Sequence, residues 1–102
     1  MIVYEVTLEI DADVCAAFRT WLRGHVQEIL ALPGFVGAEV FERHEPAAAV
    51  GQHGLCVVYR LVDQAALDRY LRDDAPRLRA DGQARFGGRF SASRRVLLLL
   101  TF

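Results

Sequence analysis

The sequence predicts a domain of the α+β class, with four antiparallel strands in one sheet and helices on one face of that sheet. First, segments with the alternating pattern of strands and segments with the 3.6-residue period of helices follow one another in the order β-α-β-β-α-β, the ferredoxin-like arrangement. Second, the chain has 102 residues without a repeat or low-complexity segment, so we expect a single domain over residues 1–102. Third, 53% of the residues are apolar and 25% are charged, a balance typical of globular proteins.

The first strand and the first helix have the clearest patterns. Every second side chain of residues 2–10 is apolar, which predicts a strand with one buried face. Asp11 and Asp13 are residue types that favour a helix N-terminus, and Pro33-Gly34 ends the helix that follows. The apolar side of this predicted helix is formed by Val14, Phe18, Trp21, Leu22, His25, Ile29 and Leu32.

Three further segments have the composition of strands. Residues 35–44 and 55–62 are rich in apolar and aromatic side chains, and the segment between them, 45–54, is expected to be a long loop. Residues 89–102 end the chain in a largely apolar run and are predicted as the fourth strand.

Two helices are predicted between the third and fourth strands. Asp63 is expected to cap a short helix. Asp74 followed by Pro76 predicts the start of another, because proline is tolerated in the first turn of a helix and not later. Gly87-Gly88 is expected to end this helix.

The third and fourth predicted strands are apolar on both sides, unlike the first. A sheet face in contact with water normally carries polar side chains at every second position. Cys56, Val58, Leu97 and Leu99 would instead form an apolar patch larger than monomeric proteins usually expose. We therefore expect a homodimer in which the sheet of a second copy covers this face.

Two adjacent arginines interrupt the fourth predicted strand. Because successive side chains of a strand point to opposite faces, either Arg94 or Arg95 must point toward the core or toward the dimer interface. A guanidinium in such a place needs a carboxylate partner, for which Glu5 and Glu9 are candidates.

The charges argue against nucleic-acid and membrane partners. The net charge is −1, so no overall field attracts the chain to either. Residues 1–50 hold eight acids and three arginines, whereas residues 51–102 hold nine arginines and five aspartates. RNA binding on a ferredoxin-like sheet needs stacking aromatic and basic residues on the third strand, where the sequence offers Tyr59 and Arg60 alone. Three explanations of this asymmetry remain: an anionic ligand, contact between the acidic half of one copy and the basic half of another, or an ordinary solvated surface.

The sequence favours a cytoplasmic location. The first residues have no basic segment and carry an early glutamate, so they do not resemble a signal peptide. The longest apolar run, residues 96–100, is too short to cross a bilayer. Cys15 and Cys56 lack the spacing of a disulfide framework and suit a reducing compartment.

Three segments together resemble a small bacterial family known as a domain of unknown function, within the dimeric α/β-barrel superfamily. They are MIVYEVTLEI at the start, WLRGHVQEILALPGF in the first helix and RYLRDDAPRLRADGQARFGGRF before the last strand. The resemblance covers nearly the whole chain and implies a ferredoxin-like fold whose sheets pair into a barrel. The superfamily includes cofactor-independent monooxygenases, haem-degrading enzymes, isomerases and many proteins without an assigned activity, so this fold does not determine the function.

His25 is the candidate catalytic residue. It lies on the apolar side of the first predicted helix, between Trp21 and Ile29, so it faces the sheet. The resemblance implies that a ligand would lie in this layer, and we expect Tyr4, Trp21, His25 and Glu28 to bind it. Glu28 is close enough in the helix to hydrogen-bond the imidazole, which would then be suited to act as a general base. The alternative is that His25 is a packed ring whose nitrogens bond to a tyrosine hydroxyl or a carbonyl.

No cofactor or metal is expected. His44 and His53 do not have the short spacing of a zinc site, and the glycines do not form a phosphate-binding motif. Ser91 and Ser93 have no histidine nearby in sequence that could activate them. The haem-degrading enzymes that this chain resembles use an asparagine, and the sequence contains none.

Three functions stay open on the sequence alone. The first is a homodimeric domain that binds a small, mainly apolar organic molecule between the first helix and the sheet. The second is a cofactor-independent isomerase or monooxygenase with His25 as general base. The third is a protein-interaction module that uses the loop 45–54 or the arginine-rich surface.

Overall fold

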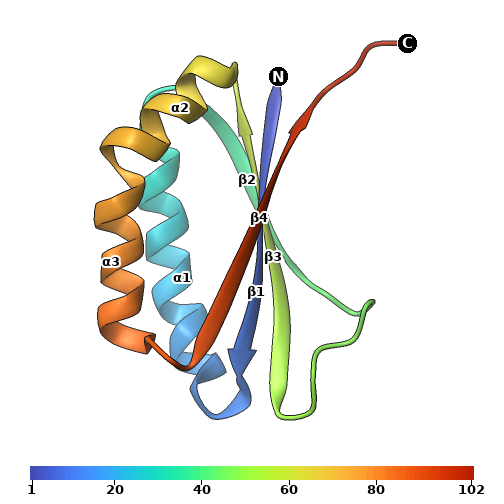
Figure 1. The fold of residues 1–102 in the computed structure, drawn as a ribbon, viewed down its shortest axis with the longest axis vertical. Coiled ribbons are helices and arrows are strands. Elements are labelled where there is room, and N and C mark those ends of the chain that lie inside the picture. The colour runs from blue at the N-terminus through green and yellow to red at the C-terminus, as the bar shows by residue number, and fades with distance from the viewer.

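The computed structural model describes residues 1–102 as two layers, with all the helices on one face of a single sheet (Figure 1). The elements in chain order are β1 (Ile2–Asp11), a 3-10 turn (Ala12–Val14), α1 (Cys15–Leu30), β2 (Phe35–Glu42), β3 (Gln52–Leu61), α2 (Gln64–Asp73), α3 (Ala75–Phe86) and β4 (Phe90–Leu98). This order confirms the predicted ferredoxin-like fold.

The sheet has the strand order β2-β3-β1-β4, and every neighbouring pair is antiparallel. β1 is therefore central, and β2 and β4 form the two edges. Tyr4 lies opposite Tyr59 on one side and opposite Val96 on the other. Residues that are directly opposite share a face of the sheet, so this register places all three side chains on the side of the helices.

The core lies between the helices and the sheet. Nineteen apolar residues form one buried cluster there, and no polar or charged residue is buried. The alternation predicted for the first strand is confirmed, because Ile2, Tyr4, Leu8 and Ile10 are buried and the residues between them are not.

The predicted helix starts are correct within a few residues, but only one aspartate acts as a cap. The Asp63 carboxylate accepts a hydrogen bond from the backbone N–H of Ala66 at 2.9 Å, as expected for an N-cap. Asp74 lies between α2 and α3, which follow each other with no other residue in between. Its carboxylate accepts from Arg77 instead of capping α3.

The aspartates expected to cap the first helix have another role. α1 begins at Cys15, after the 3-10 turn, and no side chain caps it. Asp11 and Asp13 both accept hydrogen bonds from Arg89, with 2.9 Å between Arg89 Nε and Asp11 Oδ2. These contacts tie the end of β1 to the start of β4.

Of the strand boundaries that differ from the prediction, two do so because β1 limits the sheet; in addition, β2 ends at Glu42, two residues before the predicted end. β3 begins at Gln52, three residues earlier than predicted, since β1 runs on to Asp11 and pairs with it. β4 ends at Leu98, opposite Ile2, because no further residue of β1 is left to pair. One more hydrogen bond, from the N–H of Leu99 to the carbonyl of Met1, closes this end.

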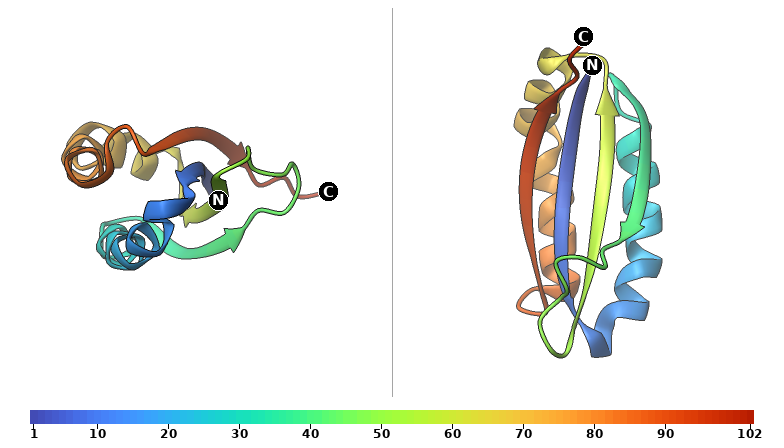
Figure 2. Two further views of the ribbon diagram at one scale, coloured as in Figure 1. Left: turned by 90° about the horizontal axis from the view of Figure 1, so that it is seen from below. Right: turned by 90° about the vertical axis from the view of Figure 1, so that its right-hand side faces the viewer.

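The face of the sheet opposite the helices carries three ion pairs. Figure 2 shows this open face in front of the helices, with β1 and β3 at its centre. Glu5–Arg95 joins β1 to β4, and Glu39–Arg60 joins β2 to β3. The third pair, Glu9–Arg43, joins β1 to the residue that follows β2. Arg95 is thus the arginine of β4 that lies on this face, and of the two candidate carboxylates it is Glu5 that pairs with it.

The apolar residues of the open face lie among these pairs. Cys56 and Val58 are partly buried by their neighbours within the chain. Leu97 is 39% exposed, Leu99 60% and Phe41, on β2, 51%. The face therefore combines apolar side chains with carboxylates that are all neutralised by arginines.

Candidate functional site

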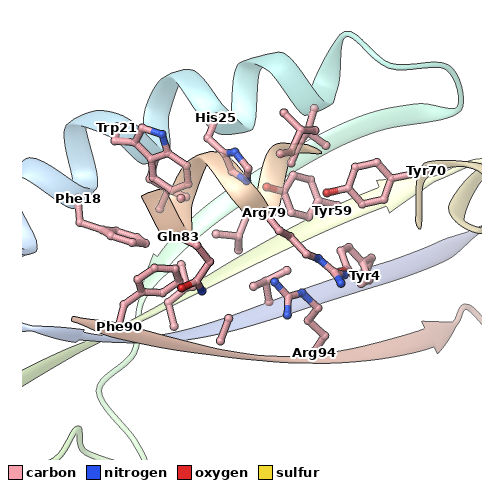
Figure 3. Close-up of a pocket in the computed structure, with 18 residues that line it drawn as sticks. Tyr4, Phe18, Trp21, His25, Tyr59, Tyr70, Arg79, Gln83, Phe90 and Arg94 are labelled. Atoms are coloured by element: carbon pink, nitrogen blue, oxygen red, sulfur yellow. The ribbon is translucent and has the colours of Figure 1, made fainter. Parts of the chain in front are cut away.

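A cavity of about 330 Å³ lies between α1, α3 and the β1–β4 half of the sheet (Figure 3). It is lined by 18 residues, of which 13 are hydrophobic, and none of the 18 is an aspartate or glutamate. The lining comes from α1, α2, α3, β1, β3 and β4, so residues distant in sequence meet here. The sequence placed the candidate site in this same layer, between the first helix and the sheet.

One helix supplies an aromatic wall of the cavity. Phe18, Trp21 and His25 are three and four residues apart in α1, so their side chains lie on one side of the helix. The rings of Phe18 and Trp21 meet edge to face, with centroids 5.3 Å apart. His25 stacks on Trp21 with a centroid distance of 4.5 Å and an interplanar angle of 25°.

The indole of Trp21 is fixed from the side of α3. Its Nε1–H donates to the Asp81 carboxylate at 2.9 Å. Gly82 lies against the ring, and a Cβ at this position would be only 3.0 Å from the indole Cη2. The absence of a side chain at Gly82 therefore lets α3 approach the tryptophan.

His25 has no hydrogen-bond partner within the protein. Its side chain is partly buried, points into the cavity and makes none of the hydrogen bonds of the structure. Burial lowers the pKa of His25 below its ordinary value of 6.5; nearby Glu28 and Asp81 oppose this shift, and Arg94 adds to it. At neutral pH the imidazole is therefore uncharged, with a nitrogen lone pair that could accept a proton from a bound molecule.

The other end of the cavity is polar and basic. The Arg79 Nη2 donates to the phenolic oxygen of Tyr4 at 3.0 Å, and Arg94 extends beside them from β4 (Figure 3). Burial raises the pKa of Tyr70 to about 12 and that of Tyr59 further, so both hydroxyls stay protonated. The arrangement offers hydrogen-bond donors at one end and aromatic surfaces at the other.

Three of the four residues expected to bind a ligand, Tyr4, Trp21 and His25, line the cavity. Glu28 does not: it is exposed, and its carboxylate accepts from Arg77 of α3 at 3.2 Å. The expected hydrogen bond between Glu28 and His25 is absent, because the Glu28 carboxylate binds Arg77 of α3 instead. Whether the three lining residues bind a ligand stays a prediction.

Sequence reasoning missed the basic end of the cavity. The sequence left open which of Arg94 and Arg95 faces the helices. The register of β4 places Arg94 on the helix side of the sheet, opposite Val6. Arg79 belongs to an arginine-rich helix and nothing in its local pattern separates it from Arg77 or Arg85. The register of β4 against β1 is the one signal that could have selected Arg94 from the sequence.

Other kinds of site find no support in the arrangement of side chains. No three His, Cys, Asp or Glu side chains gather in a way that would hold a metal ion. His44 hydrogen-bonds Glu42 on the surface at 3.1 Å. No helix combines the length and the apolar character needed to cross a membrane.

Known structures share the fold of this chain at low sequence identity. A putative antibiotic biosynthesis monooxygenase from Deinococcus radiodurans superposes with a TM-score of 0.76 at 14% identity, over 100% of this chain and 95% of that one. A variant of SnoaB, a cofactor-independent oxygenase from Streptomyces nogalater, gives 0.67 at 14% identity, over 99% and 95%. A variant of MhuD with two manganese protoporphyrin IX bound per active site gives 0.73 at 14%, over 100% and 97%.

These similarities establish the fold and leave the activity open. A comparison with curated protein sequences finds no match. Residues 1–100 match the sequence pattern of a family described as "Domain of unknown function (DUF4286)", which spans nearly the whole chain. The fold, the cavity and this match together confirm the resemblance seen in the sequence, and the chain belongs to the DUF4286 family.

Proposed function

We propose that this protein binds a small, mainly apolar organic molecule in the cavity between α1, α3 and the sheet. The observation that carries the proposal is the cavity itself, about 330 Å³ in a chain of 102 residues. Pockets for small molecules in proteins begin at roughly this size, about 300 Å³, and have mainly apolar walls with a few polar groups. Water in such a space makes few hydrogen bonds, so an apolar ligand replaces it favourably.

The rigidity of the aromatic wall supports the same function. The indole of Trp21 is held by Asp81 on one side and by the backbone at Gly82 on another. A wall that is already ordered loses little conformational entropy on binding, which favours affinity. Trp21, Phe18 and Phe90 are inclined to one another and offer both ring faces and ring edges, against which an aromatic ring of a ligand can pack.

A substitution that fills the cavity tests the proposal. Ala92 lines the cavity from β4, and Ala92→Phe would place a ring in the space of the ligand. The matched control is Ala80→Phe, at an exposed position of α3. With 2-naphthamide as a neutral probe, we expect binding by calorimetry to the unmodified protein and to Ala80→Phe, and none to Ala92→Phe. Equal binding to all three proteins would contradict the proposal.

A second candidate function is catalysis with His25 as general base. It is favoured by the lack of any protein hydrogen bond to an imidazole that faces the cavity and is neutral at pH 7. His25 would accept a proton from an acidic C–H bond of the ligand, leaving the electron pair in an enolate. Return of the proton at another carbon would be an isomerisation, and reaction of the enolate with dioxygen would be an oxygenation, the activity named for SnoaB.

Proton abstraction can be measured without knowledge of the natural substrate. 2-Tetralone is a bicyclic ketone with an acidic C–H bond, and its exchange with D₂O can be followed by NMR. We expect the protein to accelerate this exchange and His25→Gln to remove the acceleration. His53→Gln, a substitution at an exposed position of β3, is the control. Equal exchange rates of 2-tetralone with the unmodified protein and with His25→Gln would contradict catalysis by His25, and ligand binding would remain as the function.

We also propose that the protein is a homodimer joined through the open faces of its two sheets. Two observations support it: the face holds exposed Leu97 and Phe41, and its carboxylates are paired with arginines. Neutralised carboxylates cost less to remove from water than free ones. In such a dimer the helices would cover one face of each sheet, and the sheet of the second copy would cover the other face.

The proposed location is the cytoplasm. Cys15 is buried at the start of α1 and Cys56 lies on the open sheet face, and both are free thiols. Free thiols without a disulfide persist in a reducing compartment. Fractionation of cells that produce the protein, with detection by antibody, would test this location.

A further inference from the structure

The arginines of this chain fall into two groups by their partners. Seven of the 12 form ion pairs with carboxylates of the chain: Arg43, Arg60, Arg72, Arg77, Arg85, Arg89 and Arg95. The other five have no carboxylate partner, and two of these line the cavity described above: Arg79 and Arg94. The cavity thus collects two unpaired positive charges and, as its lining shows, no negative one.

The two arginines converge from different elements. Arg79 comes from α3 and Arg94 from β4, and both guanidinium groups lie near the Tyr4 ring at the same end of the cavity (Figure 3). The hydrogen bond to Tyr4 positions Arg79 at 3.0 Å from the phenolic oxygen and leaves its other N–H groups free. Arg94 makes no hydrogen bond within the protein, so its N–H groups are all available.

The charges also act on the rest of the cavity. Arg94 lowers the pKa of His25 and so adds to the larger effect of burial on this residue. Burial raises the pKa of Tyr59 and Tyr70; Arg94 opposes this rise at both tyrosines, and Arg79 opposes it at Tyr70. Arg94 is therefore within electrostatic range of three other lining residues. An anion beside Arg94 would therefore lie within electrostatic range of His25.

The position of the arginines fits an anion at the mouth of the cavity. Both residues are exposed, whereas Phe18 and Leu78 deeper in the cavity are buried. A ligand with an apolar body and one charged group could place the body among the aromatic rings and keep the charge where water still reaches it. Guanidinium groups bind carboxylates through paired, nearly planar hydrogen bonds, so a carboxylate is the anion that this arrangement suits.

We propose that the ligand of this cavity is an organic acid whose apolar, ring-containing body lies against Trp21 and Phe18 and whose carboxylate is bound by Arg79 and Arg94. The proposal rests on the proposed ligand-binding function and names the class of molecule. It also explains why these two arginines lack partners in a chain where most arginines have one.

A charged and a neutral probe of the same shape test the proposal. 2-Naphthoate carries the carboxylate, and 2-naphthamide replaces it by an uncharged group. We expect the unmodified protein to bind 2-naphthoate more tightly than 2-naphthamide. Arg94→Gln and Arg79→Gln should each weaken binding of 2-naphthoate by roughly 10-fold to 100-fold, as expected for loss of a hydrogen bond to a charged group. Both substitutions should leave the affinity for 2-naphthamide nearly unchanged.

The control is Arg69→Gln, which removes an exposed arginine of α2 that has no ion pair and lies outside the cavity. It should bind 2-naphthoate like the unmodified protein. Arg94→Gln breaks no contact within the protein, so its result holds even if Arg79→Gln disturbs Tyr4.

The outcomes separate the two proposals. If both probes bind equally well to the unmodified protein and to the Arg79 and Arg94 variants, the acid-specific proposal is overturned and the cavity still binds a ligand. If Arg69→Gln weakens 2-naphthoate binding as much as Arg94→Gln does, the effect is one of overall charge and the proposal is again overturned. Binding of neither probe at millimolar concentration would overturn the ligand-binding function as well.

Discussion

The imidazole of His25 stacks on the indole of Trp21, with ring centroids 4.5 Å apart and planes inclined by 25°. Trp21 is in turn held by the carboxylate of Asp81 through its Nε1–H. The orientation of His25 in the cavity therefore depends on a contact between α1 and α3. This chain of contacts links the packing of two helices to the residue most suited to chemistry.

The pH dependence of stability should depend on His25. Its pKa is lowered from 6.5 in the folded protein, so the unfolded chain binds more protons between the two values. The stabilisation that the neutral ring provides is complete above pH 6.5 and is lost as the pH falls toward the lowered value. We expect the free energy of unfolding in urea to fall between pH 7.5 and 5.5, and to fall less in His25→Gln. A control with His53→Gln should keep the full pH dependence; an identical pH profile for His25→Gln would contradict the burial of the neutral ring.

Removal of the Asp81 carboxylate should loosen the aromatic wall. Asp81→Ala leaves the indole N–H of Trp21 without its acceptor, and we expect a loss of about 1 kcal/mol of unfolding free energy. The tryptophan fluorescence should also change, because Trp21 is the only tryptophan of the chain. Asp68→Ala is the control, since Asp68 is an exposed helical aspartate that accepts only from Gln64. An unchanged fluorescence spectrum in Asp81→Ala would show that the contact does not hold the ring.

Two helical glycines should respond differently to alanine. Nothing lies within 4 Å of a Cβ added at Gly24 of α1, so Gly24→Ala should stabilise the protein by about 0.5–1 kcal/mol through helix propensity. At Gly82 of α3 the same Cβ would be 3.0 Å from the Trp21 ring, so Gly82→Ala should lose that gain. Thermal unfolding of both variants measures the difference. A gain in Gly82→Ala equal to that in Gly24→Ala would refute the close approach.

The proposed homodimer should depend on the open face of the sheet. Leu97→Arg places a charge among the apolar side chains of this face, and we expect it to shift the protein from dimer to monomer in analytical ultracentrifugation. Val62→Arg is the control: Val62 is 53% exposed and follows the end of β3, so the substitution adds the same charge outside the strands of the open face. A monomer for the unmodified protein at micromolar concentration would exclude the proposed pairing.

The sequence was informative wherever one residue and its close neighbours decide the structure. The alternation of β1, the periodicity of α1, the cap at Asp63 and the restart of a helix near Pro76 are all local effects, and each is confirmed. The same holds for the fold class, since the order of the elements follows from these local patterns.

The parts that were missed depend on partners far away in sequence. Asp13 was expected to cap a helix, but Arg89, 76 residues later, binds it instead. Glu28 was assigned to His25 because both lie on one helix, whereas Arg77 of another helix takes its carboxylate. Arg79 joins the cavity only because α3 lies across the sheet at one particular angle. No single-sequence pattern contains that angle.

The central place of β1 bears on how the protein folds. This strand is synthesised before the other strands of the sheet, yet one of its two neighbours is β4, which is synthesised last of the four. Half of its backbone hydrogen bonds therefore wait for residues 90–98 to be synthesised. Contacts between such distant segments slow folding, because a long loop must close before they form. A nascent chain cut short before β4 would expose the edge of β1 and be prone to aggregation.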